Sequence, residues 1–382
     1  MSALDGLDRV GTFGAGAFSS VGCYRGDNVK LCPFHKNGHS LVAVKMYRNV
    51  SNSPRYLRIQ HEVKVLKTLT SRNSCKYVNE LNKDIVAESG VYLFLRPALG
   101  GSLNKHIVRG AKGRLSPSVA KGYAAEIFTA IQAVHSLWCV HRDVKANNIL
   151  LDHHGHAILC DFGSAKCLSR DAGGVDMTSF DILGNVILPT KEQPLDQKVK
   201  YAELPRTYTM VGTPHAMAPE VANKVGHSFA ADWWGCGVLL YEMLCGAPPQ
   251  WHNREVEPTS RVEDDWDWTL PTHDGYGIGG DAVDEAERRL HDHGLDLVAL
   301  LVTQDPAKRW ELVASIQSHA FFVGVDWSAV SAGTSRPADL AFDRRLGLID
   351  ILEVEEARSA TQGGGTANDE LTAEQQALFD GY

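Results

Sequence analysis

The sequence predicts an α+β protein of two lobes, a small antiparallel β-sheet lobe with one main helix and a larger, mainly helical lobe. In roughly the first hundred residues, short apolar strands alternate with turns, and beyond residue 115 helical spacing of apolar residues takes over. The chain has 382 residues, enough for two units of ordinary domain size. With 44% hydrophobic and 22% charged residues, its composition is typical of a globular protein and excludes wholesale disorder.

Strands of the first lobe are predicted where apolar residues cluster between turn residues, at 10–18, 21–25, 41–47 and 91–96. Residues 55–69 carry apolar side chains three or four positions apart, which places them on one face of a helix. A proline and a glycine pair then punctuate the chain, and the predicted lobe boundary lies there.

The second lobe is predicted to begin with a capped helix, because Ser116 can cap it and Pro117 is tolerated in its first turn. Residues 230–244 are apolar almost throughout and predict a buried helix. Residues 167–205 show little periodicity and predict a long loop. The predicted division is a first lobe of residues 1–95, a second lobe of residues 96–322 and a partly disordered tail of residues 323–382.

The composition also limits the classes of partner that we expect. The net charge of −8 gives the chain no general basic character, so neither nucleic acid nor a membrane is expected as a partner. No apolar stretch approaches the roughly 18 residues of a membrane span. The first residues show no secretion signal, so we expect the protein in the cytoplasm or the nucleus. The eight cysteines are expected to be reduced and mostly buried.

A glycine-rich segment joins the first two predicted strands. Because glycine has no Cβ, backbone N–H groups in such a segment can approach phosphate oxygens closely. A strand follows it, so it differs from the dinucleotide-binding fingerprint, in which a helix follows. The segment consists of Phe13, Gly14, Ala15, Gly16, Ala17, Phe18, Ser19, Ser20 and Val21.

A lysine and a glutamate suggest a buried ion pair. Lys45 lies among apolar residues of a predicted strand, where an isolated charge would be costly unless it is paired. Glu62 lies in the middle of the helix that follows and can supply the counter-charge. A lysine at the strand edge that reaches water is the alternative.

A third cluster has the composition that phosphoryl transfer needs. That reaction requires a group that orients the attacking hydroxyl, cations near the γ-phosphate and oxygen ligands for magnesium. Asp143 can supply the first and Lys145 the second. Asn148 and Asp161, which begins an Asp-Phe-Gly triplet, can supply the third.

Together these motifs resemble those of the eukaryotic protein kinase family. The segment GTPHAMAPE at residues 212–220 resembles the family's substrate platform, Asp232 its buried helix start and Arg309 the partner of Glu220. The resemblance covers about residues 8–330. It implies the bilobal protein kinase fold and an active enzyme that uses ATP and Mg²⁺ to modify proteins.

The resemblance also implies a role for each motif residue. Asp143 would be the catalytic base, Lys45 would position the α- and β-phosphates while paired with Glu62, and Asn148 and Asp161 would hold Mg²⁺. The residues implied to enclose the adenine are Val21, Ala43, Leu95 and Leu150.

Finer features resemble one kinase group. Lys145 and Thr213 imply serine or threonine substrates, not tyrosine. Residues 206–214 resemble the activation segment of cyclic-nucleotide-dependent kinases, of the AGC group, and residues 341–343 and 379–382 resemble its tail motifs. The sequence departs from the pattern of this group at positions that concern substrate recognition. Neutral side chains stand at Ser102 and Asn147, where basic-substrate kinases of the group have glutamates, although Glu242 is kept.

Thr209 is the predicted regulatory phosphorylation site. A phosphate there adds nearly two negative charges and needs cations to order the segment. The candidate cations are Arg58, Arg142 and Lys166. The partners considered are an upstream kinase, which would modify this position, and a separate regulatory subunit.

Two other functions remain open. A small-molecule phosphotransferase of kinase-like fold would share Asp143, Asn148 and Asp161, but it is not expected to have the 212–220 segment. A non-catalytic kinase-like scaffold would bind partners through the loop at 167–205 and the tail.

Overall fold

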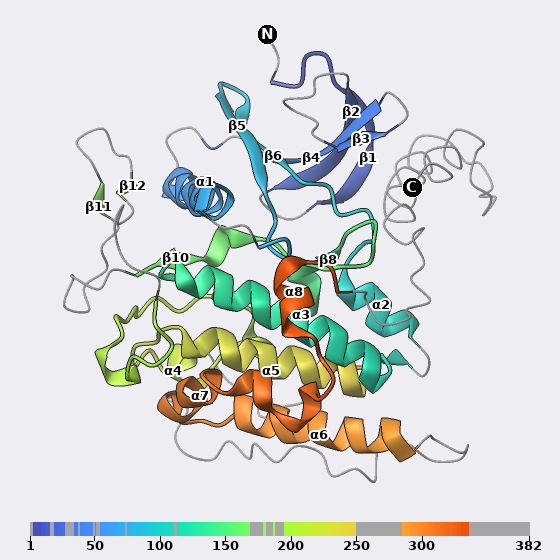
Figure 1. Ribbon diagram of the computed structural model, residues 1–382. Helices are drawn as coiled ribbons and strands as arrows, with labels where there is room; N and C mark the ends of the chain where they lie inside the picture. The colour runs from blue at the N-terminus through green and yellow to red at the C-terminus, as the bar shows by residue number, and fades with distance from the viewer. Residues whose placement is uncertain are drawn as a thin grey trace.

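The protein has two lobes, a β-sheet with one long helix above and a stack of helices below (Figure 1). This confirms the predicted α+β fold. The computed structural model describes residues 3–15, 19–26, 34–36, 39–48, 50, 54–72, 75–110, 113–168, 179–180, 186–187, 195–249 and 285–335.

The upper lobe is built on an antiparallel sheet with the strand order β1-β2-β4-β6-β5, and β3 pairs with β4. Its register places Lys45 between Val21 and Leu93 in the centre of the sheet. Strands β3 and β5 were not predicted from the sequence. The residues of β5 are mixed in polarity, so they do not form the apolar cluster that marks the other strands. The strands are β1 (Asp8–Ala15), β2 (Ser20–Gly26), β3 (Phe34–Lys36), β4 (His39–Arg48), β5 (Leu81–Ala87) and β6 (Gly90–Leu95).

Helix α1 (Pro54–Arg72) lies beside this sheet (Figure 1). Its buried apolar residues include Leu66 and Leu69, as the helical spacing predicted. The helix begins one residue before the predicted range and ends three residues after it.

The lower lobe is organised around α5, whose side chains are buried along almost its whole length. Helices α3 and α6 pack against it, and Ser116 caps α3 by accepting a hydrogen bond from the Val119 N–H. The helices of this lobe are α2 (Leu103–Arg109), α3 (Pro117–Ser136), α4 (Pro219–Ala222), α5 (Ala230–Cys245), α6 (Glu285–Leu301), α7 (Pro306–Val313) and α8 (Trp327–Ala332).

Short strands flank the motif residues of the lower lobe. Strand β7 (Cys139–Val140) pairs with β10 (Lys166–Cys167), and β8 (Ile149–Leu151) pairs with β9 (Ala157–Leu159). The segment predicted as a loop at 167–205 also contains β11 (Ser179–Phe180) and β12 (Val186–Ile187), which pair with each other. Apart from residues 167–168 and these two strands, the part of that segment before residue 195 lies outside the described residues, as do the tail motifs at 341–343 and 379–382.

The pairing of β7 with β10 brings two cysteines together. Cys139 lies opposite Cys167, with a Cα–Cα distance of 4.0 Å, and a disulfide joins them. The prediction that all cysteines are reduced is therefore wrong for this pair. Because the pair is separated by 28 residues in the sequence, only the fold reveals its proximity.

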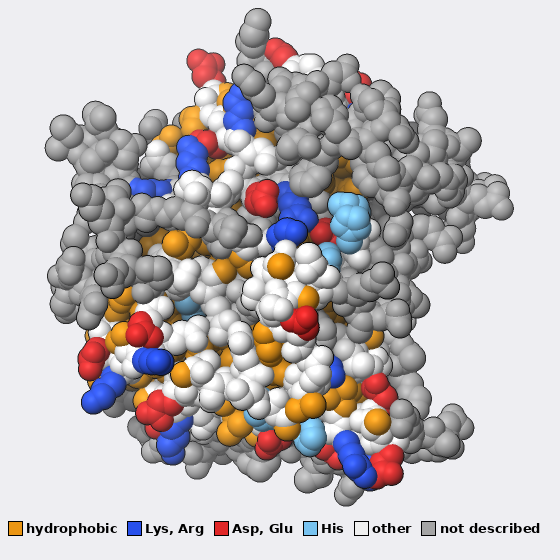
Figure 2. Space-filling view, viewed as in Figure 1, with side chains coloured by type: hydrophobic (Ala, Val, Ile, Leu, Met, Phe, Trp, Pro, Cys, Tyr) orange, Lys and Arg blue, Asp and Glu red, His pale blue; other side chains and the backbone are white. Residues whose placement is uncertain are grey.

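On the face shown in Figure 2, basic and acidic side chains lie close to one another over the helical lobe. Among the helices that the structure describes, none has both the length and the hydropathy to cross a bilayer.

We predict that reducing the Cys139–Cys167 disulfide lowers the free energy of unfolding by about 3–4 kcal/mol, the chain-entropy value for a loop of this length. Urea unfolding of the wild type with and without a thiol reductant measures the change. Cys167→Ser is the control, because it should be less stable and insensitive to the reductant. A wild type whose unfolding midpoint ignores the reductant would contradict the prediction.

A second prediction concerns Glu242 on α5, whose pKa is raised by burial from 4.5 to about 7. Between these values the folded protein keeps a proton that the unfolded chain has released. The carboxyl's contribution to stability is therefore full below 4.5 and is lost as the pH rises through about 7.

Glu242→Gln should remove this titration, so its unfolding temperature should change less than that of the wild type between about pH 5 and about pH 8. Glu311→Gln, an exposed glutamate on α7, should keep the wild-type pH dependence. Parallel curves for wild type and Glu242→Gln would show that burial does not perturb this carboxyl.

Candidate active site

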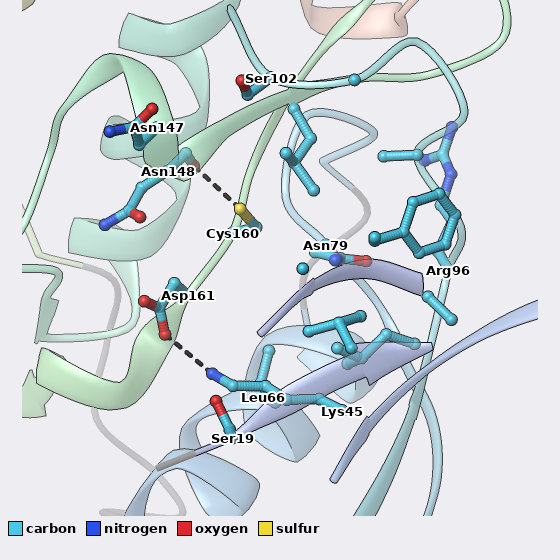
Figure 3. Close-up of a pocket in the computed structure, with 18 of the residues that line it drawn as sticks. Ser19, Lys45, Leu66, Asn79, Arg96, Ser102, Asn147, Asn148, Cys160 and Asp161 are labelled. Atoms are coloured by element: carbon cyan, nitrogen blue, oxygen red, sulfur yellow. Dashed lines mark hydrogen bonds and ion pairs between the residues drawn. The ribbon is translucent and has the colours of Figure 1, made fainter. Parts of the chain in front are cut away.

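A cavity of about 630 Å³ lies between the sheet and the helical lobe (Figure 3). The residues predicted to enclose a nucleotide that line it are Phe13, Gly14, Ser19, Val21, Ala43, Leu95 and Leu150. Ser20 lies on β2. Gly16, Ala17 and Phe18 lie outside the described residues, as does the side chain of Ala15.

Lys45 is the centre of the ion network at one end of this cavity. Its Nζ donates to Glu62 Oε1 at 2.8 Å and to Asp161 Oδ1 at 2.9 Å, so the structure brings together three residues from distant parts of the sequence. Figure 3 shows Lys45 reaching Asp161 across the cavity. The second carboxylate oxygen of Glu62 accepts a hydrogen bond from the Tyr47 hydroxyl. Tyr47 was not predicted from the sequence as a residue of the site. Its position two residues after Lys45 places it on the same face of the strand, and this spacing could have indicated its role.

The charge of Lys45 is secured by its partners. Burial alone would lower the pKa of its ammonium, but the negative charges of Glu62 and Asp161 outweigh that effect and hold the pKa well above its ordinary value. The pKa of Asp161 is lowered despite its burial, because Lys45 favours the carboxylate. The site therefore presents a fixed positive charge at neutral pH.

Asp232, at the start of α5, anchors the backbone of the segment that carries Asp143. Asp232 accepts hydrogen bonds from the backbone N–H groups of His141 at 2.8 Å and Arg142 at 2.7 Å. Its Oδ2 also lies 2.8 Å from His135 Nε2. Although burial would raise the pKa of Asp232, these hydrogen bonds outweigh it and lower the pKa. Arg142 has a φ of 68°, an uncommon value for this residue type that these bonds stabilise.

Asp143 lies in a compact polar cluster. Its Oδ2 accepts from Lys145 Nζ at 2.8 Å and from Asn148 Nδ2 at 2.9 Å, while its Oδ1 accepts from the Thr213 hydroxyl at 2.6 Å. Lys145 Nζ also donates to Thr213 Oγ1 at 2.6 Å. Thr213 thus lies beside both the aspartate and the lysine. Burial would raise the pKa of Asp143, but the hydrogen bonds from Lys145 and Thr213 lower it, so the carboxylate is charged at neutral pH.

Gly212 allows the segment that bears Thr213 to approach this cluster. Its φ is +116°, and a Cβ built on it would lie 2.6 Å from the carbonyl oxygen of Arg142. A side chain at this position would therefore clash with the backbone just before Asp143. The glycine permits close contact between the two segments.

Asn148 and Asp161 fit the predicted magnesium role by their donor atoms. Asn148 directs its Nδ2 toward Asp143, so its amide oxygen can face another partner. Asp161 uses one oxygen for Lys45, and its side chain remains 47% exposed. Mg²⁺ binds to a few such protein oxygens and completes its coordination with water and phosphate oxygens. In Figure 3 both side chains lie on the same side of the cavity.

Beneath the site, helix α1 of the upper lobe packs against the turn Phe162–Ser164 of the lower lobe. The rings of His141 and Phe162 meet edge to face with 5.0 Å between centroids, and Leu66 of α1 is also buried. Cys160 lines the cavity, and its Sγ donates to the Asn148 carbonyl at 3.1 Å. Burial strongly raises the pKa of this thiol, so it is protonated and unreactive at neutral pH.

Glu220 and Arg309 form the buried ion pair that the resemblance implied. Arg309 also donates to the Ala230 carbonyl and lies 5.3 Å from the centre of the Trp234 ring. This arginine is completely buried, and it links α4, the start of α5 and α7. The platform segment at 212–220 is thereby anchored to the helical core.

Thr209 and its three candidate cations all belong to the described residues. Thr209 is exposed, and Arg58 on α1 is exposed as well. Lys166 donates to the hydroxyl of Thr207 at 2.9 Å, two residues before Thr209, and Arg142 Nε donates to the Ser164 carbonyl at 2.6 Å. The predicted cations thus come from three different segments, and two of them are held close to Asp143 and Asp161 by their places in the sequence.

A groove of about 610 Å³ lies between α1 and β5. Its lining includes Tyr56, Ile59 and Val63, next to Lys64 and Lys67. The tail end at 379–382, which resembles a motif of the AGC group, lies outside the described residues.

Comparison with known proteins agrees with this geometry. Residues 8–322 match the family described as protein kinase domain. The chain is 31% identical to the serine/threonine-protein kinase sax-1 of Caenorhabditis briggsae over 305 residues, 76% of this chain and 61% of that protein. It is also 31% identical to the serine/threonine protein kinase ypkA of Aspergillus fumigatus over 331 residues, 85% of this chain and 42% of that protein.

A third relative is the cAMP-dependent protein kinase catalytic subunit PRKX of Homo sapiens, 28% identical over 341 residues, 88% of this chain and 76% of that protein. The resemblance to cyclic-nucleotide-dependent kinases is thereby confirmed at the level of sequence. The chain spans about three-fifths of the length of the nematode kinase and about two-fifths of the fungal one. With a family match over residues 8–322 and the predicted fold in place, the chain belongs to the protein kinase domain family.

Proposed function

We propose that the protein transfers the γ-phosphoryl group of MgATP to serine or threonine hydroxyls of protein substrates. The observation that carries this proposal is the position of two charged clusters next to each other at the cavity. Lys45 and Asp161 line it, and Asp143 with Lys145 lies beside Asn148, a lining residue that donates a hydrogen bond to Asp143. A nucleotide phosphate and an acceptor hydroxyl can meet between them.

The cavity suits the two halves of a nucleotide. Val21, Ala43, Leu95 and Leu150 give it apolar walls that can hold a flat base. Lys45 offers its fixed positive charge to the phosphates. Asn148 and Asp161 would hold magnesium, whose charge would neutralise that of the phosphate oxygens.

Asp143 then orients the acceptor. Its carboxylate, held by Lys145 and Asn148, can accept the hydrogen bond of an incoming hydroxyl and take its proton as the phosphoryl group moves. Lys145 can stabilise the negative charge of the transferred phosphoryl group, because its ammonium already lies beside Asp143. Because phosphoryl transfer is accelerated mainly by positioning and electrostatics, a carboxylate of low pKa is adequate for this role.

The substrate class follows from the second segment at the cluster. Thr213, within the platform anchored by Glu220 and Arg309, bonds to both Asp143 and Lys145. The relatives named above are serine/threonine kinases, which supports the same class for this chain. A platform fixed beside Asp143 suits an extended peptide and favours a protein substrate over a small molecule.

Asp143→Asn tests the proposed activity. The amide cannot take the proton of the acceptor, so the rate of phosphate transfer to a degenerate serine/threonine peptide library should fall about 10²- to 10⁴-fold, the usual contribution of a general base. Binding of a fluorescent nucleotide should change little. A wild type that labels sugars or aminoglycosides but no peptide would support a small-molecule phosphotransferase, and one that binds nucleotide without any transfer would support a scaffold.

Thr209 is proposed as the regulatory phosphorylation site, modified by an upstream kinase or under the control of a regulatory subunit. It is exposed, and Arg142 and Lys166 belong to the segments that carry Asp143 and Asp161. A phosphate on Thr209 paired with these cations would tie both segments to the platform.

Thr209→Ala should therefore lower the activity of the phosphorylated enzyme about tenfold or more, since it removes at least one charge-assisted hydrogen bond. Thr209→Ser, which can still be phosphorylated, is the matched control and should keep most of the activity. Phosphopeptide mass spectrometry must show the phosphate on the wild type. Equal activity of Thr209→Ala and that phosphorylated wild type would refute regulation at this position.

A further inference from the structure

Glu62 is bound through both of its carboxylate oxygens by side chains of a single strand. Its Oε1 accepts from Lys45 at 2.8 Å, and its Oε2 accepts from the Tyr47 hydroxyl. Lys45 and Tyr47 are two residues apart on β4, and alternate residues of a strand face the same side of the sheet. Met46, between them, belongs to the apolar cluster on the other side. Strand β4 therefore contacts helix α1 through two polar side chains, those of Lys45 and Tyr47.

The burial of these residues makes the second contact important. Glu62 is 2% exposed, Lys45 9% and Tyr47 8%. A carboxylate at such depth needs a partner for each oxygen, because water does not reach the one left over. The phenol supplies that partner through a charge-assisted hydrogen bond, which is stronger than a bond between neutral groups.

Tyr47 is suited to remain a donor. Burial raises the pKa of its hydroxyl, and the negative charge of Glu62 raises it further, so the proton stays on the phenol at physiological pH. Its ring centre also lies 5.2 Å from the Lys45 ammonium, within the range of a cation–π contact. Tyr47 thus contacts both members of the ion pair.

The bonded oxygen faces the Asp161 segment. A Cβ built on Gly163 would lie 3.5 Å from Glu62 Oε2, so this glycine and the carboxylate are close neighbours. Rotation of the carboxylate away from Tyr47 would therefore disturb the contact of α1 with the Asp-Phe-Gly segment as well as the bond to Lys45.

We propose that Tyr47 is a positioning residue for the phosphoryl transfer described above. Its hydroxyl fixes the rotation of the Glu62 carboxylate, which keeps Oε1 on Lys45 and keeps the Lys45 ammonium beside Asp161. The inference rests on the proposed kinase function, because only that reaction needs the ammonium at this place. Although Tyr47 is among the residues that line the cavity, in this role it acts through Glu62 and not through the nucleotide.

Tyr47→Phe removes the hydroxyl and keeps the ring. We expect kcat for peptide phosphorylation to fall about tenfold, with KM for ATP changed about twofold or less, since fewer bound complexes hold the lysine in the reactive position. Rates are measured per molecule that binds a fluorescent nucleotide, so unfolded protein does not count.

Tyr92→Phe is the matched control. Tyr92 is also 8% exposed, its hydroxyl also makes a hydrogen bond, to Ser89 at 2.9 Å, and it belongs to the cluster on the opposite side of the sheet. This variant can lose stability but should keep the wild-type kcat. Equal kcat values for Tyr47→Phe and Tyr92→Phe would overturn the inference.

An isosteric pair tests the hydrogen bond itself and serves if Tyr47→Phe folds poorly. Replacement of Tyr47 by 4-aminophenylalanine restores a donor at the same place and should recover most of the lost kcat, whereas 4-methylphenylalanine should not. The same kcat for both would overturn the inference. A wild type without kinase activity would instead refute the proposed function, so the two failures are distinguishable.

Discussion

The arrangement of this protein depends on one buried ammonium. Lys45 is in the centre of the sheet, and water does not compensate its charge there, so the chain must provide carboxylates. They come from Glu62 on a helix and from Asp161 in the other lobe. A sheet, a helix and the helical lobe are thereby forced to meet at one point, and the nucleotide-sized cavity opens beside it.

A second buried charge has the opposite sign and a different task. Asp232 binds backbone N–H groups, so it determines the path of the chain through His141 and Arg142 and not the position of a single side chain. That path places Asp143 within hydrogen-bonding distance of Asn148, which lines the cavity. The ion network of Lys45 positions the residues proposed to bind the nucleotide. The anchor at Asp232 positions the segment of Asp143, the residue proposed to orient the acceptor hydroxyl.

The sequence was sufficient for the parts of this site that depend on short motifs or on the cost of a buried charge. Lys45 required a partner, and Glu62 was the carboxylate on the nearest helix. The sequence was insufficient where contacts depend on the path of the chain between distant residues. The pairing of β7 with β10, and hence the cysteine pair, could not be inferred from residues 28 positions apart. Strand β5 was missed because its residues are mixed in polarity and only partly buried, and Tyr47 because its bond to Glu62 depends on how α1 packs against β4.

The cysteine pair has a consequence for the covalent structure of the site. Asp143, Lys145, Asn148 and Asp161 all lie between Cys139 and Cys167 in the sequence, so the disulfide closes them into a covalent ring. A protease that cuts the backbone once inside this ring linearises the loop, but both fragments stay attached to each other. Such a nicked molecule would run as two pieces only after its sulfur–sulfur bond is opened.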